Sequence, residues 1–346
     1  MKILVSGGAG FIGSHTVLEL LNADYDVVCV DNFANAIEDD MEKAVCIKRI
    51  EELTGKVVTF VKCDLKDIKR LGQIFVEHKF DAIIHVAALK SVAESVREPL
   101  MYYQNNLIGT LNLLSLCADH GIKNFVFSSS ATVYGNPEFL PITEQTQTGV
   151  GVTNPYGQSK CMNEQMLRDL VISDNSWNII VLRYFNAVGA HPSGRIGEDP
   201  KGIPNNLMPY IAQVAVGKLP YLNVYGTDYN TNDGTSLRDY IHIVDLAKGH
   251  VAALDRMDRE KNVGYEVYNL GIGKGHSVLE MVKGMEKACG HEIPIKTSPP
   301  RPGDVGEVYC DPSLAIQKLG WKTELGVDDM CRDMWNWQFN NPNGYQ

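Results

Sequence analysis

The sequence predicts an α/β fold with a doubly wound parallel sheet and a smaller C-terminal domain. Three observations predict it. Short runs rich in β-branched residues recur through the first half of the 346 residues, helix-length amphipathic segments separate them, and a glycine-rich turn directly follows the first run. The runs are almost continuously apolar, which is typical of parallel strands that helices cover on both faces.

The predicted elements follow in order along the chain. Strands are expected at residues 3–6, 27–30, 57–61, 82–86, 125–128 and 179–182, with amphipathic helices between them that include 14–22, 101–120 and 156–171. After about residue 184, Gly, Pro, Asn and Asp become frequent over 189–206 and 226–234, and loops of this kind often carry function. We therefore predict a cofactor domain over 1–183 and a substrate-binding domain over 184–346, with room for segments within about 240–270 to return to the sheet.

Composition and charge exclude several classes of protein. Hydrophobic residues make up 44% and charged residues 21% of the chain, as in a globular protein with an ample core. The formal net charge of −10 argues against a nucleic-acid partner, because such proteins need a basic surface for the phosphates. The eight cysteines form no CxxC pair, so we expect free thiols, no metal site and a reducing compartment. Without a signal peptide or an apolar run of about 18 residues, we expect a cytoplasmic protein with no membrane partner.

The glycine-rich turn predicts a dinucleotide site of the Rossmann type. Gly7, Gly10 and Gly13 lie between the first strand and the first helix, where glycines allow a tight turn and let the backbone approach a pyrophosphate. Asp31 ends the second strand, and a carboxylate there suits the free hydroxyls of a ribose and repels a 2′-phosphate, which favours NAD over NADP. Asp64 and Leu65 follow the third strand and suit the adenine edge, although that pair alone could equally be a helix cap.

A second pattern indicates acid–base chemistry. Tyr156 and Lys160 stand at i and i+4 on a predicted helix and so on one face, where an ammonium can lower the pKa of a phenol until it acts as a base. Ser130 follows the fifth strand, and ligands of open α/β sheets bind at such strand ends. The Tyr/Lys spacing alone is common by chance, so its weight comes from the glycine turn and the serine.

The glycine turn, the strand-end serine and the Tyr/Lys pair, in this order, resemble the extended short-chain dehydrogenase/reductase family. The resemblance implies that Tyr156 is the base, that Ser130 hydrogen-bonds the reacting hydroxyl, and that Lys160 binds the nicotinamide ribose. Family members that are sugar-nucleotide 4,6-dehydratases carry an Asp-Glu pair where this chain has Ala131 and Thr132, and related decarboxylases carry a Glu at the second place. Since neither carboxylate is present, the oxidised sugar is expected to take its hydride back, which implies a redox-neutral epimerisation.

The second half resembles UDP-galactose 4-epimerases, on segments that include 183–186, 189–194, 197–210, 238–242 and 301–304. The resemblance implies that UDP is held by Asn186, Asn206 and Leu207, its uracil by Asn223 and Tyr225, its diphosphate by Arg238 and Arg301, and its ribose by Asp304. It places Lys90 and Asn105 near the nicotinamide and its phosphates. We also expect the cofactor to contact Phe11, Ile12, Asn32 and Phe185. Paired guanidiniums suit a diphosphate in a chain that is otherwise acidic.

Two departures from close relatives concern the ligand pockets. Val86 and Ala88 replace the usual Phe and Gly, and Ala88 is expected to alter the approach of the backbone to the cofactor. Val308 stands where the family gates the sugar pocket. A Tyr there resembles enzymes limited to unsubstituted hexoses, whereas a small residue leaves room beside C2, so we hypothesise that UDP-GalNAc and UDP-GlcNAc are also substrates. The alternative is a plain strand valine.

Two other functions are alternatives to that of a UDP-hexose 4-epimerase. An epimerase of a UDP-uronic acid would need an extra cation facing C6, which the sequence does not place. A non-catalytic dinucleotide sensor should have lost Tyr156 or Lys160, and both are present. The resemblance further implies a homodimer packed through the helices at 101–120 and 156–171, although their apolar stripes would also suit helices that face a sheet.

Overall fold

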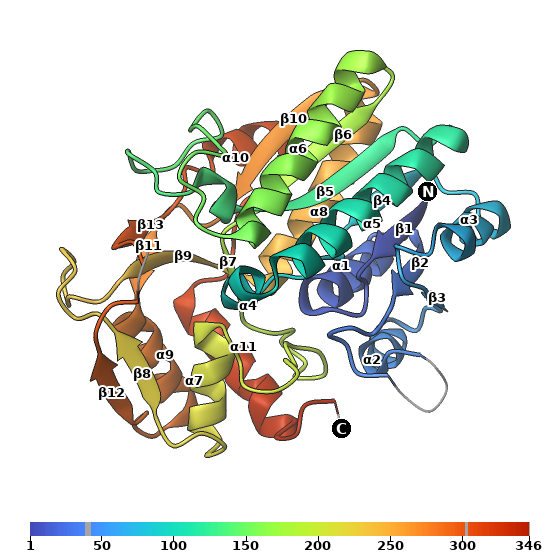
Figure 1. The fold of residues 1–346 in the computed structure, drawn as a ribbon. Coiled ribbons are helices and arrows are strands. Elements are labelled where there is room, and N and C mark those ends of the chain that lie inside the picture. Colours follow the sequence, from blue (N-terminus) through green and yellow to red (C-terminus); the bar gives the residue numbers. More distant parts are fainter. Residues whose placement is uncertain (39–42, 302–303, 346) are drawn as a thin grey trace.

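The computed structural model describes residues 1–38, 43–301 and 304–345, and its largest feature is a parallel sheet of seven strands in the order β10-β6-β5-β4-β1-β2-β3 (Figure 1). The strands of this sheet are β1 (Lys2–Ser6), β2 (Asp26–Asp31), β3 (Thr59–Lys62), β4 (Ala82–His85), β5 (Asn124–Ser130), β6 (Asn178–Tyr184) and β10 (Tyr265–Leu270). All six strands predicted in the first half are present. The third begins at Thr59 instead of Val57, whose side chain is exposed.

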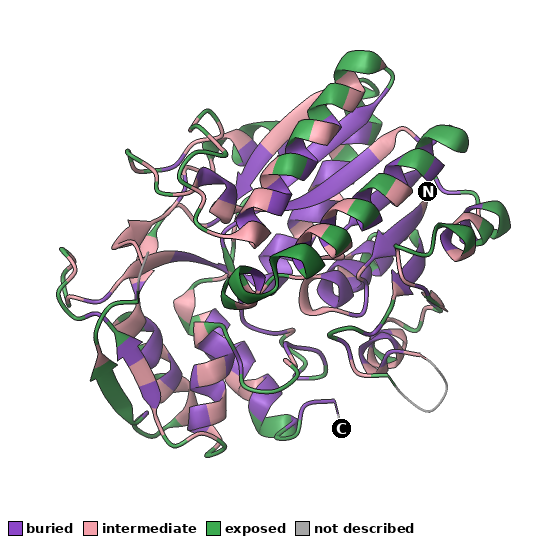
Figure 2. Ribbon diagram, viewed as in Figure 1, coloured by how far each residue is buried: buried purple, intermediate pink, exposed green. Residues whose placement is uncertain are grey.

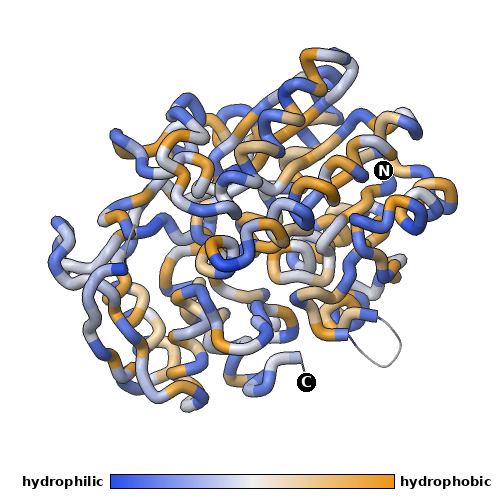
Figure 3. Tube along the Cα trace, in the orientation of Figure 1, coloured by the Kyte–Doolittle hydropathy of each residue, from blue (hydrophilic) through white to orange (hydrophobic). Residues whose placement is uncertain are grey.

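Helices cover both faces of the sheet, as the apolar strands predict. The alternation along β1 shows this: Ile3 and Val5 belong to the hydrophobic core beneath α1 (Phe11–Asn22) and α8 (Ile243–Glu260), whereas Leu4 belongs to the core beneath the helices on the other face. Those helices are α3 (Ile68–Glu77), α5 (Pro99–Asp119) and α6 (Pro155–Ser173). In Figure 1, α5 and α6 lie in front of the sheet and α8 behind it. Figure 2 shows buried strands between these layers, and Figure 3 shows hydrophobic and hydrophilic residues alternating along the covering helices.

The remainder of the second half forms a smaller lobe beside the carboxyl ends of the strands (Figure 1). Its four-stranded sheet has the order β11-β9-β13 with β7 paired to β9, and a two-stranded sheet joins β12 and β8. Its strands are β7 (Asn186–Val188), β8 (Leu222–Tyr225), β9 (Leu237–His242), β11 (Gly275–Ser277), β12 (Ile295–Ser298) and β13 (Glu307–Val308). The helices not yet named are α2 (Val45–Thr54), α4 (Val92–Arg97), α7 (Leu207–Ala215), α9 (Val278–Cys289), α10 (Ser313–Leu319), α11 (Val327–Asn340) and the short 3₁₀ helix η1 (Ala131–Tyr134).

Within residues 240–270, the two segments expected to return behave differently. β10 pairs in parallel with β6 and extends the large sheet, and α8 covers that sheet. Tyr240 to His242, in contrast, belong to β9, which pairs with β7, β11 and β13. The division of the chain at 183/184 stays a prediction.

Two further properties of the described residues bear on function. Among them, no helix combines the length and the apolar content that crossing a membrane requires. Nor do three or more His, Cys, Asp or Glu side chains gather in residues 1–38, 43–301 and 304–345 as a metal site would need. All eight cysteines are free thiols.

Candidate functional site

The glycine turn between β1 and α1 has no room for a side chain at Gly7 or Gly13. Gly7 has φ 72°, and a Cβ there would lie 2.6 Å from the backbone nitrogen of Ala87. A Cβ on Gly13 would overlap the carbonyl oxygen of Gly7. Gly10 is the N-cap of α1 and provides no side-chain cap, so the first N–H groups of the helix are left to another acceptor. The turn is therefore a cradle in which backbone donors can approach a phosphate closely.

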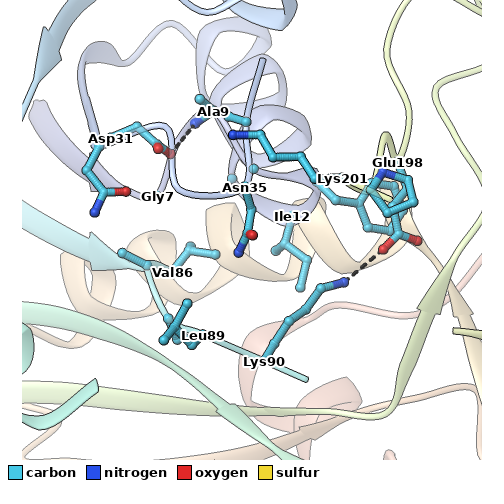
Figure 4. A pocket seen from close by; sticks show the side chains of 18 of the residues that line it. Gly7, Ala9, Ile12, Asp31, Asn35, Val86, Leu89, Lys90, Glu198 and Lys201 are labelled. Atoms are coloured by element: carbon cyan, nitrogen blue, oxygen red, sulfur yellow. Dashed lines mark hydrogen bonds and ion pairs between the residues drawn. The ribbon is translucent and has the colours of Figure 1, made fainter. Parts of the chain in front are cut away.

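Asp31 closes one side of this cradle at the end of β2 (Figure 4). Its carboxylate accepts hydrogen bonds from the backbone N–H of Ala9 at 3.1 Å and of Phe33 at 2.9 Å. Burial raises the pKa of Asp31, and these backbone donors and Lys201 act in the opposite direction. Beside it, Asn32 donates to Asp64 at 3.1 Å, so two predicted cofactor residues contact each other.

One cavity brings most of the predicted cofactor residues together with the Tyr/Lys pair. The predicted residues that line it are Gly7, Gly10, Phe11, Ile12, Gly13, Asp31, Asn32, Asp64, Leu65, Lys90, Asn105, Tyr156, Lys160 and Asn206. Val86 and Ala88, the two departures from relatives, line it as well. Figure 4 shows side chains from the glycine turn, from the loop after β4 and from residues 198–201 around this space. Asn206 is the one predicted UDP residue on this wall.

Lys160 is anchored at the carboxyl end of β5. The side chain of Asn154 caps α6 by accepting from the N–H of Gly157 at 2.8 Å, which sets the first turn of the helix and the direction of its Tyr/Lys face. The ammonium of Lys160 donates to the carbonyl oxygen of Ser128 at 2.6 Å. Burial lowers its pKa to about 7, against the influence of Glu164 one turn further along.

The pKa of Tyr156 differs in direction from the sequence expectation. Burial raises it, while a hydrogen bond with Ser130 and the charge of Lys90 act to lower it. The Lys160 ammonium lies 6.0 Å from the centre of the Tyr156 ring and donates to a carbonyl. The cation that lowers the pKa of the phenol is therefore Lys90, which lies on the loop after β4. In the protein without a ligand, this lowering is smaller than the rise in pKa that burial causes.

Ser130 stands where β5 gives way to η1. Its hydroxyl accepts from the N–H of Thr132 at 3.2 Å and from the Thr132 hydroxyl at 3.0 Å, and it also meets Tyr156. Serine, tyrosine and lysine thus meet at the carboxyl end of the central strands. Ala131 and Thr132 place no carboxylate at this point.

A buried polar network beneath the site was missed by the sequence reasoning. The amide of Asn106 on α5 bonds to both backbone groups of Leu89, accepting at 2.9 Å and donating at 3.1 Å, and donates to Ser159 on α6 at 3.0 Å. It therefore fixes the loop that carries Lys90 against the helix that carries Tyr156. An asparagine in an apolar helix was the only available signal.

The predicted substrate residues in the smaller lobe form a second group. Arg301 grips Asp304 with two hydrogen bonds of 2.8 and 3.2 Å, and its guanidinium lies 5.1 Å from the centre of the Tyr225 ring. Arg238 lies on β9 beside Val308 of β13, and burial lowers its pKa. Pro302 and Gly303, between Arg301 and Asp304, lie outside the described residues.

Ten predicted residues do not line the cavity: Ser130, Phe185, Asn186, Leu207, Asn223, Tyr225, Arg238, Arg301, Asp304 and Val308. Phe185 and Val308 pack in one small core with Val133 of η1, which places the suggested gate next to the Ser130 segment. Asn186 and Asn223 lie on β7 and β8, and Leu207 begins α7. Their roles toward a ligand stay predictions.

The chain is similar to known proteins over nearly its whole length. A family model described as GDP-mannose 4,6 dehydratase matches residues 4–334. A UDP-glucose 4-epimerase of Caenorhabditis elegans is 60% identical over 347 aligned residues, covering 100% of this chain and 99% of that one. The chain belongs to the UDP-glucose 4-epimerase family.

Solved structures support the same membership. The UDP-glucose 4-epimerase of Bifidobacterium longum, solved in complex with NAD⁺ and UDP, is 55% identical with a TM-score of 0.94, covering 99% of this chain and 100% of that one. The UDP-Glc/GlcNAc 4-epimerase of Campylobacter jejuni is 34% identical with a TM-score of 0.83, covering 98% and 99%. The family model is named for a dehydratase, whereas this chain has Ala131 and Thr132 at the positions where the acidic pair of such enzymes is expected.

Proposed function

We propose that the chain is an NAD-dependent UDP-glucose 4-epimerase that interconverts UDP-galactose and UDP-glucose. The observation that carries this proposal is that Tyr156 and Lys160 line a glycine-lined cavity at the strand ends, with Ser130 hydrogen-bonded to Tyr156 and no acidic pair at residues 131 and 132. Full-length relatives with this activity in their names support it.

The residues fit NAD. The turn at Gly7 and Gly13 admits only backbone, as a pyrophosphate requires, and the Asp31 carboxylate suits a ribose with free hydroxyls. When bound, NAD supplies a hydride acceptor that returns the same hydride, so no cofactor is consumed. Lys160, with its pKa near 7 and its ammonium held by Ser128, is placed to donate to the cofactor's ribose.

Tyr156 and Ser130 handle the proton of the reaction. The Tyr156 phenolate takes the proton of the 4-hydroxyl as the C4 hydride leaves, and the Ser130 hydroxyl orients that oxygen. Lys90 stabilises the phenolate, and NAD held in the cavity would supply a further positive charge that favours the ionised form of Tyr156. The 4-keto sugar rotates while its UDP stays bound, and Tyr156 then returns the proton. Binding energy far from C4 keeps the intermediate in place.

The test is to incubate the purified protein with UDP-galactose without added NAD and to follow the anomeric protons by NMR. Formation of UDP-glucose is expected, with NAD recovered from the denatured protein. Absence of turnover after NAD is supplied would contradict the proposal.

We also propose that UDP-GalNAc and UDP-GlcNAc are substrates. Val308 packs near the Ser130 segment and is smaller than a tyrosine, and a relative named for both UDP-Glc and UDP-GlcNAc shares the fold. Val308→Tyr should abolish turnover of UDP-GalNAc and keep that of UDP-galactose, with Val308→Ile as the matched control that retains both. No turnover of UDP-GalNAc by the parent protein would refute this part.

A homodimer and a cytoplasmic location complete the proposal. Beyond the residues that face the sheet, α5 and α6 expose the apolar side chains of Leu100, Ile108, Leu111, Met162 and Ile172. Pairing of these faces in two copies would bury them, so Leu111→Glu should convert a dimer into the 38.3 kDa monomer in light scattering. A monomeric parent would contradict the dimer. Eight free thiols support the reducing location.

A further inference from the structure

We infer that Glu198 is a positioning residue that links the cofactor cavity to the UDP-binding segment of the smaller lobe. The inference rests on the proposed function and names a residue to which the sequence reasoning gave no role.

The carboxylate of Glu198 joins residues from two parts of the chain. It accepts from the Lys90 ammonium at 2.8 Å, across 108 residues (Figure 4). It also accepts from the Asn206 amide at 3.5 Å, across 8 residues. Its side chain is only 7% exposed, whereas that of Lys90 is 51% exposed. A buried carboxylate can only accept hydrogen bonds, so it fixes where an ammonium and an NH₂ group must lie.

Both partners stand where ligands are expected. Lys90 lines the cavity and acts on the Tyr156 phenol. Asn206 is the N-cap of α7, yet its side chain does not cap that helix. Its amide turns to Glu198 instead, at the start of the segment that is predicted to hold UDP. The Glu198 carboxylate therefore contacts both Lys90, which acts on the catalytic phenol, and Asn206, which is predicted to hold UDP.

The backbone at Glu198 is held from the C-terminal side. Trp337 of α11 donates its indole N–H to the Glu198 carbonyl at 3.2 Å. The N–H of Gly197 donates to the Tyr345 hydroxyl at 3.1 Å, and the N–H of Tyr345 donates to the Asp199 carboxylate at 2.8 Å. A Cβ on Gly197 would overlap the Trp337 ring. These contacts fix the backbone position of Glu198, so its carboxylate can orient the long side chain of Lys90.

The test uses the full chain with its cofactor and the single variants Glu198→Gln, Lys90→Met and Asn206→Ala, with the two doubles that contain Glu198→Gln. It measures kcat with UDP-galactose and the Kd of UDP by calorimetry. Glu198→Gln should lower kcat about 10-fold or more, as for loss of the ion-paired hydrogen bond to Lys90. It should weaken UDP binding about threefold, because the hydrogen bond from Asn206 is long. In the Lys90→Met background it should lower kcat no further, and in the Asn206→Ala background it should leave the Kd of UDP unchanged.

Asp199→Asn is the matched control, because it removes a carboxylate that contacts the C-terminal segment instead of Lys90. Its effects on kcat and Kd should multiply with those of Lys90→Met and Asn206→Ala. Wild-type behaviour of Glu198→Gln, or effects that multiply in both doubles, would overturn the inference. If the parent protein neither binds UDP nor epimerises UDP-galactose, the proposed function fails instead, which this design distinguishes.

Discussion

Replacement of Glu164 by Gln is expected to destabilise the fold strongly, because Glu164 neutralises a buried arginine beneath the site. Arg183 of β6 donates to its two carboxylate oxygens at 3.0 and 2.6 Å, and Ser129 of β5 donates at 2.6 Å. The two charged side chains are 2% and 4% exposed. The pair joins α6, which carries the Tyr/Lys face, to the two strands under it.

The magnitude follows from this burial. Removing one partner of a buried ion pair leaves the other charge without water or counterion and costs about 3–5 kcal/mol. At about 2.1 cal/mol/K of unfolding entropy per residue, a chain of 346 residues gains roughly 0.7 kcal/mol/K on unfolding. Glu164→Gln should therefore lower Tm by about 4–7 °C in a calorimetric scan.

An exposed pair provides the control. Lys287 and Asp328 lie 2.6 Å apart with side chains 71% and 69% exposed, and such pairs contribute at most about 1 kcal/mol. Asp328→Asn should shift Tm by less than about 1.5 °C. If Glu164→Gln moved Tm no more than this control does, the claim that Arg183 depends on Glu164 for its charge would be wrong.

Three further predictions concern the site and pH. Tyr156→Phe should lower kcat about 10²–10⁴-fold, the range for loss of a general base, while NAD recovered from the denatured protein stays at the parent amount. Gly13→Ala should lose bound NAD, because its Cβ overlaps the Gly7 carbonyl, and absorbance of the extracted cofactor reports this; a fully loaded Gly13→Ala protein would disprove the cradle. Stability should fall below pH 6.5, because burial lowers the pKa of three histidines, so the unfolded chain binds protons that the folded chain does not. Each such histidine contributes up to about 1.4 kcal/mol per pH unit between pH 6.5 and its folded pKa, which is about 3, 3 and 4 for His15, His85 and His250. Equal urea midpoints at pH 7.5 and 5.5 would contradict the titration argument.

The features predicted from sequence are those that local patterns encode. Ile3, Leu4 and Val5 are consecutive apolar residues, so both faces of the strand that they form are apolar. This pattern predicts a parallel strand covered on both faces, without knowledge of the neighbouring strands. The glycine spacing specified the cradle, since only backbone fits at Gly7 and Gly13. The order of Ser130, Tyr156 and Lys160 is also a local pattern, and the structure brings the three residues together at the end of β5, while their catalytic roles stay predictions.

The features that were missed depend on contacts between distant parts of the chain. Lys90 forms an ion pair with Glu198, which lies 108 residues further along the chain. Neither the periodicity of apolar residues nor the spacing of a motif predicts such a pair. The pKa of Tyr156 was expected to fall through Lys160, but Lys160 donates to the carbonyl of Ser128 and burial raises the phenol's pKa. The spacing i, i+4 places two side chains on one face of a helix without fixing what each contacts. Similarly, segments within about 240–270 were expected to return to the large sheet, but Tyr240 pairs with Asn186 of β7 in the smaller lobe.

The hold of Tyr345 on residues 197–199 has a consequence for biosynthesis. The glycine cradle and Asp31 leave the ribosome early, and the sheet around them can begin to form while translation continues. The same cavity is also lined by Tyr345, whose ring packs against Trp337 at an interplanar angle of 52° and lies under the guanidinium of Arg49. The nascent chain therefore cannot complete this wall of the cavity until residue 345 has emerged, so full enclosure of a cofactor follows the synthesis of that residue.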